Sequence, residues 1–333
     1  QNMKNYAPVI AQEVEGWIAD WGDEGELDFM DEFLELTIHT ATHCLLGKDF
    51  RDKMTAEFKT LYRDLEAGLQ AIAFVDPYMQ QPIFEQRDRA RERLEEIITA
   101  MIDERRNSDI EYNDALATFM TGTYADGSCL TSTEVTGLVI ATIFAGHHTS
   151  SGTSTWMLTE LARHPKETAA IVEELNAIYQ QDETLSHNAL REMPKMESFL
   201  NEVLRVHPPL VVLMRRVIND IEFDGHAIPA GKTVAISIFG SHRNPEYFPN
   251  PEIFDPSRTE PETMFAYIPF GGGRHKCGGN AFALLQQKAI FSALLRRYSF
   301  EIVDQSDSYV DDLSGMVLRP KSPCRLRYKR RVS

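Results

Sequence analysis

Apolar residues recur at helical spacing along most of the first half of the chain. The opening stretch carries them on one face, which indicates an amphipathic helix built on Val9, Ile10, Val14, Trp17, Ile18 and Trp21. Asp28 can cap a second helix that ends near Leu46, because Gly47 then stops it. Further helices are predicted over 58–73 and 87–106, the latter with alternating charges typical of a solvated face.

The longest helical segment begins at a capping box, in which Thr131 and Glu134 satisfy each other's backbone amides. It continues to Arg163, just before Pro165 stops it, and would be roughly 50 Å long. Its middle, residues 145–155, is rich in Gly, Ser, Thr and His, which are weaker helix formers than Ala or Leu. This composition predicts a local distortion retained for function. A polar patch held straight by tertiary packing is the plain alternative.

The last third of the chain has the pattern of short strands and one more helix. An extended segment is predicted over 210–217, and the glycine-containing turns after it indicate hairpins. A final helix is predicted over 281–298. The pattern therefore favours a mainly α-helical protein with small β-sheets, in one domain that is helix-rich over 1–207 and mixed over 208–333.

Composition narrows the class of protein. The chain has 333 residues, of which 43% are hydrophobic, so it can bury a substantial core. Its net charge of −16 argues against a nucleic-acid partner. The four cysteines are far apart in sequence, which favours reduced thiols in a cytoplasmic protein: Cys44, Cys129, Cys277 and Cys324. No apolar run is long enough to span a membrane.

Two histidines lie one turn apart on the second predicted helix, and this spacing can bind a metal ion. His39 and His43 would then supply two ligands from one helix face. The segment has no glutamate between them and no obvious third ligand. Ordinary packed or surface histidines are therefore the favoured interpretation.

The chemistry of the chain is concentrated in the loop Phe270–Gly279, whose sequence is Phe-Gly-Gly-Gly-Arg-His-Lys-Cys-Gly-Gly. Cys277 lies where this loop turns into a helix N-terminus, and free backbone N–H groups and the helix dipole stabilise a thiolate there. Glycines let further N–H groups approach the sulfur. These are the properties of an axial thiolate ligand to haem iron. A glycine-rich phosphate loop, or an ordinary turn with a buried thiol, fits the residues equally well.

A family resemblance decides between these interpretations. Phe270, Gly273, Cys277 and Gly279 match the Phe-x-x-Gly-x-x-x-Cys-x-Gly loop of the cytochrome P450 superfamily. The resemblance implies that Cys277 is the proximal ligand of haem b and that Phe270 packs on the thiolate side. It also implies a P450 fold. Family members carry a further segment ahead of the position of Gln1, so we expect this fold to lack its N-terminal portion, where any membrane anchor would lie.

The long helix carries a second part of the resemblance. Ala145, Gly146 and Thr149 are similar to the superfamily's distal-helix motif, in which the threonine hydroxyl helps to deliver protons. Most members have an acid before that threonine, whereas this chain has His148. The string Gly-His-His-Thr-Ser resembles the sterol 14α-demethylases. We expect His148 to act in proton delivery, oriented by a carboxylate for which Glu66 is the candidate; a hydrogen bond within the helix is the plain alternative.

Three further residues resemble the superfamily's fixed structural triad. Glu202 and Arg205 form the Glu-x-x-Arg pair, and Arg258 in the segment 254–258 stands where the third member is expected. Ser257 replaces the usual acid before that arginine. The resemblance implies a latch for the proximal loop and no catalytic role.

The resemblance also implies residues around the haem and the substrate. Arg215 and His275 are expected to bind the haem propionates, although Arg215 could also be a plain surface arginine. The expected substrate pocket is apolar and contains Phe144, Ala145, Leu210, Leu213, Met316 and Val317.

The implied reaction is monooxygenation, in which two electrons and two protons cleave dioxygen. A sterol 14α-demethylase acting on a lanosterol-like sterol is the favoured hypothesis. The alternatives are a P450 hydroxylase of a fatty acid or terpenoid, and a truncated non-catalytic haem-binding protein. The implied partners are an electron donor of ferredoxin, flavodoxin or reductase type and, as inhibitors, azoles that coordinate the iron. A basic patch is expected to steer the donor, formed by Arg274, Lys276, Lys288, Arg296 and Arg297.

Overall fold

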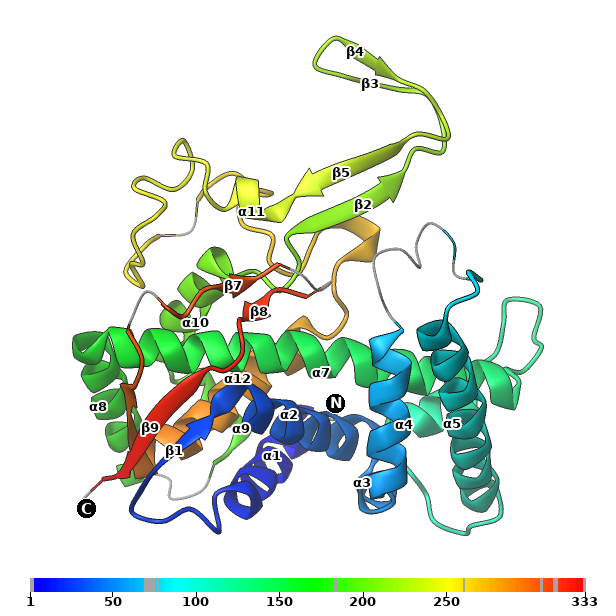
Figure 1. Ribbon diagram of the computed structural model, residues 1–333, viewed down its shortest axis with the longest axis horizontal. Coiled ribbons are helices and arrows are strands. Elements are labelled where there is room, and N and C mark those ends of the chain that lie inside the picture. The colour runs from blue at the N-terminus through cyan, green and yellow to red at the C-terminus, as the bar shows by residue number, and fades with distance from the viewer. Residues whose placement is uncertain are drawn as a thin grey trace.

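The computed structural model describes residues 3–68, 76, 78–181, 185–259, 261–305, 308–313 and 317–331. Helices dominate the chain as far as residue 206 (Figure 1). They are α1 Met3–Trp17, α2 Phe29–Leu46, α3 Lys48–Asp52, α4 Ala56–Ala67, α5 Pro82–Arg106, α6 Ala115–Met120, α7 Ser132–Arg163, α8 Pro165–Gln181, α9 His187–Arg191 and α10 Pro194–Val206. Two further α-helices follow, α11 Ile238–Ser241 and α12 Asn280–Arg297, with a 3₁₀ turn η2 at Gly273–His275.

The strands form small antiparallel sheets, as the sequence predicts. One sheet has the order β1-β9-β6 and joins the start of the chain to its end; the other three are strand pairs. The strands are β1 Glu24–Asp28, β2 Val212–Arg216, β3 Ile221–Phe223, β4 His226–Ile228, β5 Thr233–Ser237, β6 Tyr298–Ile302, β7 Asp311–Asp312, β8 Arg319–Pro320 and β9 Arg325–Arg330. The division into a helix-rich and a mixed part of one domain stays a prediction.

α7 runs across most of the width of the molecule, with β2, β3, β4 and β5 above it and α1, α2 and α3 below it in this view (Figure 1). It begins at the predicted capping box, with both Thr131 and Glu134 bonds present. From Ser150 to Leu161 every residue is buried. Two hydrophobic clusters pack against it: one with α1, α2, α10 and α12, the other with α2, α4 and α5.

The predicted distortion in the middle of α7 is wrong. The helix is continuous from Ser132 to Arg163. Hydroxyl groups in the polar stretch donate to carbonyls one turn earlier, as Thr149 does to Ala145 at 2.8 Å and Thr153 to Thr149 at 2.8 Å. Because these side chains are satisfied within the helix and the surrounding elements bury it, tertiary packing outweighs their weak intrinsic propensity.

Other predicted boundaries differ at helix ends. The helix predicted over 58–73 is α4, which begins earlier, at a Thr55 cap, and ends at Ala67; residues 69–75 lie outside the described residues. The helix predicted to begin at Arg87 begins at Pro82, whose fixed backbone angle suits the first helical turn. None of the described helices is both long enough and apolar enough to cross a bilayer.

Two glycines of α7 give a matched test of this packing. A Cβ added at Gly152 would meet the backbone carbonyl oxygen of Leu318 at 2.9 Å, whereas one added at Gly137 meets nothing within 4 Å. We expect Gly152→Ala to lower the free energy of unfolding by about 1–3 kcal/mol, because the strand or the helix must shift. Gly137→Ala should raise it by about 0.5–1 kcal/mol, because alanine favours the helix. Denaturant unfolding measures both, and equal effects would contradict the close approach.

Candidate haem-thiolate site

The cysteine loop is closed by a backbone hydrogen bond. The N–H of Cys277 donates to the carbonyl of Phe270 at 2.9 Å, which brings the two predicted residues together. Gly271 and Gly273 both have φ of +69°, a conformation that disfavours side chains. A Cβ added at Gly279 would lie 3.8 Å from the Cys277 sulfur. The three glycines therefore shape a tight turn around an open sulfur atom.

Cys277 is suited to act as a thiolate ligand. It precedes α12 by three residues, so its sulfur lies at the positive end of a helix of 18 residues. Its side chain is exposed, whereas Cys44 and Cys324 are buried. Burial raises the pKa of Cys324 to about 11, which keeps that thiol protonated and inert.

The loop faces the middle of α7 across a narrow apolar cleft. Thr149 and Thr153 of α7 line the cleft on one side, and Phe270, Ala283 and Leu284 line it on the other. Ala145, one turn before Thr149, is exposed although it lies in the middle of the molecule's longest helix. An exposed thiol in a loop whose Phe270 shares an apolar cleft with Thr149 fits a haem held through Cys277.

Arg215 and His275 have no carboxylate partner in the described part of the chain. Arg215, on β2, donates only to the adjacent carbonyl of Met214 at 2.9 Å. His275, at the end of η2, is exposed. β2 lies beside the loop, since a Cβ added at Gly271 would be 3.5 Å from Leu213. Both residues are thus available for the haem propionates, and that role remains a proposal.

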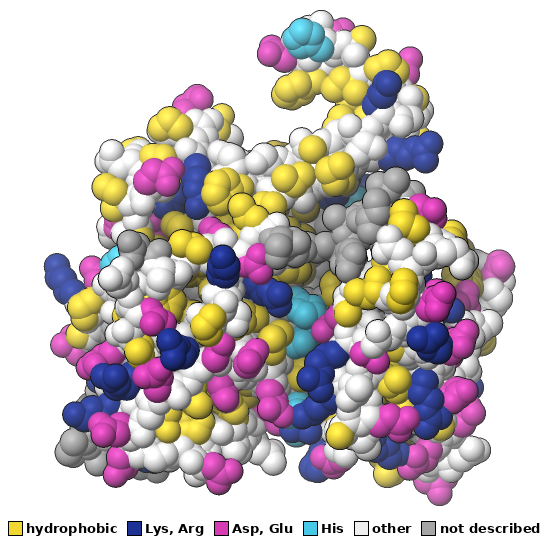
Figure 2. Space-filling model, in the orientation of Figure 1, with side chains coloured by type: hydrophobic (Ala, Val, Ile, Leu, Met, Phe, Trp, Pro, Cys, Tyr) yellow, Lys and Arg dark blue, Asp and Glu magenta, His cyan; other side chains and the backbone are white. Residues whose placement is uncertain are grey.

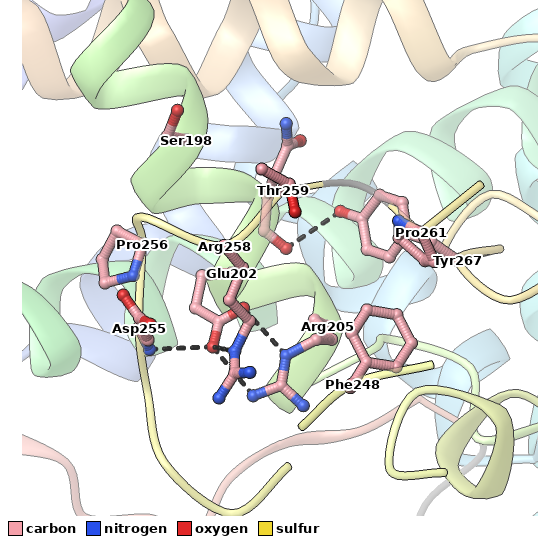
Figure 3. A pocket seen from close by; sticks show the side chains of 11 residues that line it. Ser198, Glu202, Arg205, Phe248, Asp255, Pro256, Arg258, Thr259, Pro261 and Tyr267 are labelled. Atoms are coloured by element: carbon pink, nitrogen blue, oxygen red, sulfur yellow. Dashed lines mark hydrogen bonds and ion pairs between the residues drawn. The ribbon is translucent and has the colours of Figure 1, made fainter. Parts of the chain in front are cut away.

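The predicted triad is assembled on α10 (Figure 3). Arg205 donates two hydrogen bonds to Glu202, each 2.8 Å long, and Arg258 donates a third at 3.1 Å. Glu202 and Arg205 are almost fully buried. Both residues line a pocket of about 150 Å³. Tyr267 lines the same pocket, and its hydroxyl donates to the backbone carbonyl of Asn201 on α10 at 2.9 Å. The triad therefore fixes the segment that leads into the cysteine loop.

His242, which the sequence did not single out, connects the triad to this loop. Its carbonyl accepts a hydrogen bond from Arg205 at 2.9 Å, and its Nε2 accepts one from the backbone N–H of Ile268 at 2.9 Å. Since Nε2 accepts, the proton is on Nδ1, which donates to the Arg205 carbonyl at 3.2 Å. Burial lowers the pKa of His242 to about 4, so the ring stays neutral and keeps these bonds. No sequence motif marks this histidine.

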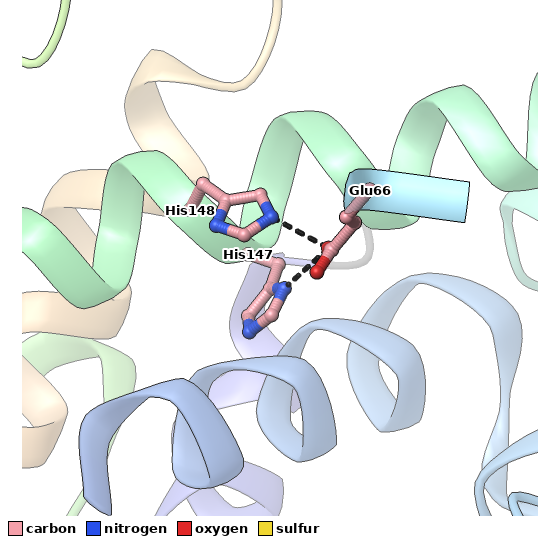
Figure 4. Close-up of side chains that lie close together, drawn as sticks. All are labelled: Glu66, His147 and His148. Atoms are coloured by element: carbon pink, nitrogen blue, oxygen red, sulfur yellow. Dashed lines mark hydrogen bonds and ion pairs between the residues drawn. The ribbon is translucent and has the colours of Figure 1, made fainter. Parts of the chain in front are cut away.

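The predicted partner of His148 is confirmed. Nε2 of His148 lies 2.5 Å from Glu66, which is in the last turn of α4, and Nδ1 of His147 lies 3.4 Å from the same oxygen (Figure 4). Burial would raise the pKa of Glu66, but the hydrogen bond with His148 and the neighbouring ring of His147 outweigh burial and lower it to about 2. Glu66 is therefore ionised at neutral pH, and His148 is oriented from outside its own helix.

Comparison with known proteins identifies the family. The sequence profile of the family described as Cytochrome P450 matches residues 1–327. The chain belongs to the cytochrome P450 family. It is 43% identical to the sterol 14alpha-demethylase of Mycobacterium tuberculosis over 344 residues, which cover 100% of this chain and 76% of the relative. It is 40% identical to the sterol 14-demethylase of Arabidopsis thaliana, covering 99% of this chain and 70% of the relative.

A solved P450 structure has the same fold. It is the structure described as retinoic acid bound cyanobacterial CYP120A1, which matches with a TM-score of 0.89 and 26% sequence identity. The match covers 99% of this chain and 75% of the chain in that structure. The chain is thus a P450 monooxygenase that resembles the sterol 14α-demethylases, and the family implies a haem with cysteine thiolate ligation, an apolar substrate, dioxygen and an electron donor. The expected family, fold and enzyme class are confirmed.

The predicted substrate-pocket residues of this P450 do not line the cleft itself, but those that the structure describes lie on or beside elements that border it, and their role remains a prediction. Phe144 and Ala145 are on the part of α7 that is not fully buried. Leu210 is 36% exposed, and Leu213 approaches Gly271. Val317 is held nearby, because the N–H of Leu318 donates to the Pro209 carbonyl at 2.8 Å. Met316 lies outside the described residues.

The predicted basic patch is wrong in part. Lys288 is buried and pairs with Glu197 of α10 and the Leu190 carbonyl, so it cannot meet a partner protein. Arg297 pairs with Glu15, and the guanidinium of Arg296 lies 3.6 Å above the ring of Tyr179. Arg274 and Lys276 remain as exposed cations of the cysteine loop.

The two exposed cysteines give a matched test of the haem ligand. In the haem-loaded, reduced and carbon-monoxide-bound protein, we expect Cys277→Ala to abolish the red-shifted Soret band of thiolate-ligated iron. Cys129→Ala, which also removes an exposed thiol, should leave the band unchanged. The absorption spectrum measures both. Retention of the band in Cys277→Ala would assign the ligand elsewhere.

Proposed function

We propose that this P450 removes the 14α-methyl group of a lanosterol-like sterol as formate, using haem b. The observation that carries the proposal is the His148–Glu66 pair, placed beside Thr149, which lines the same cleft as Phe270 of the cysteine loop. The relatives named as sterol 14-demethylases, at 43% and 40% identity, support the substrate class.

The reaction balances over three rounds, each consuming one dioxygen, two electrons and two protons and releasing one water. The first round inserts oxygen into a methyl C–H bond and gives an alcohol. The second oxidises the alcohol to the aldehyde, with loss of a further water from the hydrated form. In the third, the aldehyde carbon leaves as formic acid, and loss of a neighbouring hydrogen leaves a ring double bond. Every round therefore needs two protons delivered at the distal side.

The chain's own residues divide this work between the two sides of the cleft. Cys277 would hold the haem through its sulfur, with Arg215 and His275 on the propionates. When bound, the haem activates dioxygen, assisted by electron donation from the thiolate. Thr149 lies opposite and has a hydroxyl that can donate a hydrogen bond. That hydroxyl now donates to the Ala145 carbonyl, so it must rotate toward the cleft before it can serve.

Proton supply to Thr149 is the task we assign to His148. A hydroxyl cannot deliver a net proton without a source behind it, and imidazole exchanges protons near neutral pH. Glu66 orients His148 through their hydrogen bond and, being ionised, favours a proton on the ring nitrogen that faces it. Both side chains are 16% exposed, so protons can enter from the α4 side.

The second candidate is a P450 acting on another apolar substrate. One observation favours it: the solved structure with a TM-score of 0.89 is described as bound to retinoic acid.

Difference spectra of the haem-loaded protein, titrated with lanosterol, retinoic acid and palmitic acid, distinguish the two candidate functions. The proposal requires lanosterol to displace the iron's water ligand at the lowest concentration. A response to retinoic or palmitic acid alone would replace it with the second candidate. Azoles should compete with lanosterol by coordinating the iron.

Removal of His148 should separate proton delivery from binding. We expect His148→Ala to leave the haem spectrum and sterol affinity nearly intact, while product per NADPH consumed falls by about 10²-fold, the lower range for general acid–base catalysis. The reducing equivalents lost should appear as peroxide. Glu66→Gln should give a smaller loss of the same kind. His226→Ala, an exposed histidine of β4, is the control and should change nothing. Unchanged coupling in His148→Ala would remove this residue from the mechanism.

Electron delivery gives a second test, based on the two cations of the loop that remain exposed. Arg274→Glu and Lys276→Glu should each slow reduction by an acidic ferredoxin, and the loss should shrink at high salt because the charges are screened. Stopped-flow reduction measures the rates. Arg89→Glu, on the exposed face of α5, is the control. Salt-independent rates in the loop variants would contradict electrostatic steering.

A further inference from the structure

One ring nitrogen of His147 is buried without a hydrogen-bond partner in the described part of the chain. Nε2 of His147 lies 2.9 Å from the carbonyl of Leu34, and since a carbonyl can only accept, Nε2 carries the proton. Nδ1 is then left with an unshared lone pair, and it has no partner. The residue is 5% exposed, so water does not readily reach this atom. Such an atom costs free energy unless something binds to it.

The unpartnered nitrogen points toward two other potential ligands (Figure 4). Oε1 of Glu66 lies 3.4 Å from Nδ1 of His147 and 2.5 Å from Nε2 of His148. The three ligand atoms all lie within 4.8 Å of one another. A lone pair that faces a carboxylate oxygen is unfavourable, because both atoms are hydrogen-bond acceptors. A cation between them would turn this repulsion into two favourable contacts.

We propose that Glu66, His147 and His148 form a binding site for a zinc-type divalent metal ion. Zinc bonds to imidazole nitrogen and carboxylate oxygen at about 2.0–2.2 Å, and tetrahedral geometry then separates two ligand atoms by about 3.3 Å. The His147–Glu66 separation of 3.4 Å already fits. The His148–Glu66 separation must lengthen from 2.5 Å, which a rotation of the carboxylate achieves. Three protein ligands leave the fourth position to water.

The surroundings of the three ligands are those of a metal site. His147 donates its other N–H to the Leu34 carbonyl, the outer hydrogen bond that fixes the ring in most metal-binding histidines. Two imidazoles and one carboxylate favour zinc, cobalt or copper over magnesium or calcium. Two ligands lie on α7, and the third lies in the last turn of α4. A bound ion would therefore cross-link the two helices.

The site does not depend on the proposed sterol chemistry. A bound ion would replace the His148–Glu66 hydrogen bond, so in the proposed function it would also block proton delivery and inhibit turnover. Metal uptake is measured without turnover, so failure of the metal site and failure of the proton relay are separate results.

Equilibrium dialysis of the haem-loaded protein against buffered Zn²⁺ tests the site. We expect one zinc per chain in a Cys129→Ser background, which removes an exposed competing thiol. His147→Gln and Glu66→Gln should weaken zinc binding by about tenfold or more. His39→Gln is the matched control, because His39 lies on α2, outside the three proposed ligands, with its Nε2 3.9 Å from Glu35, and should bind zinc as the parent does. Absence of zinc uptake, or equal uptake in all variants, would overturn the proposal.

X-ray absorption at the zinc edge keeps the test informative if a variant folds poorly. The parent protein should show only nitrogen and oxygen ligands, at about 2.0–2.2 Å. A sulfur shell at about 2.3 Å would place the ion on a cysteine and overturn the assignment.

Discussion

The structure depends on the burial of α7 on all sides. Twelve consecutive residues of this helix, from Ser150 to Leu161, are buried, although seven of them carry hydroxyl groups or a carboxylate. Burying polar groups costs free energy unless they form hydrogen bonds inside the protein. Thr153, Thr155 and Thr159 find theirs in carbonyls of the preceding turn. Small polar residues thus let neighbouring helices and strands approach α7 closely, while these three hydroxyl groups stay hydrogen-bonded.

The same constraint sets the distance between the two sides of the haem-thiolate site. Gln287 of α12 is buried; it donates to the Ser150 carbonyl at 3.1 Å and accepts from the Ser154 hydroxyl at 2.9 Å. α12 begins three residues after Cys277, and Ser150 follows Thr149. These buried bonds therefore fix the helix that carries the threonine relative to the helix that follows the thiolate. The polar stretch serves both packing and chemistry.

Features set by a local rule or a motif could be predicted from the sequence, whereas features set by tertiary contacts could not. The capping box at Thr131 and the Glu202–Arg205 pair involve neighbouring residues, and both are present. Lys288 could not be assigned correctly, because its burial depends on α10, far away in sequence. His242 has no motif, and the unpaired nitrogen of His147 depends on the Leu34 carbonyl. The contact of His148 with Glu66 could be proposed only because the chemistry required a carboxylate.

Release of the methyl carbon tests the central claim most directly. The haem-loaded protein should be given lanosterol labelled with carbon-14 in the 14α-methyl group, an electron donor and dioxygen. The proposed function requires one labelled formate for each demethylated sterol, at the cost of three dioxygen molecules. The labelled alcohol and aldehyde, which are the products of the first and second rounds, should be consumed as labelled formate accumulates. Turnover that hydroxylates the sterol elsewhere and leaves the label in the steroid would contradict the proposed function.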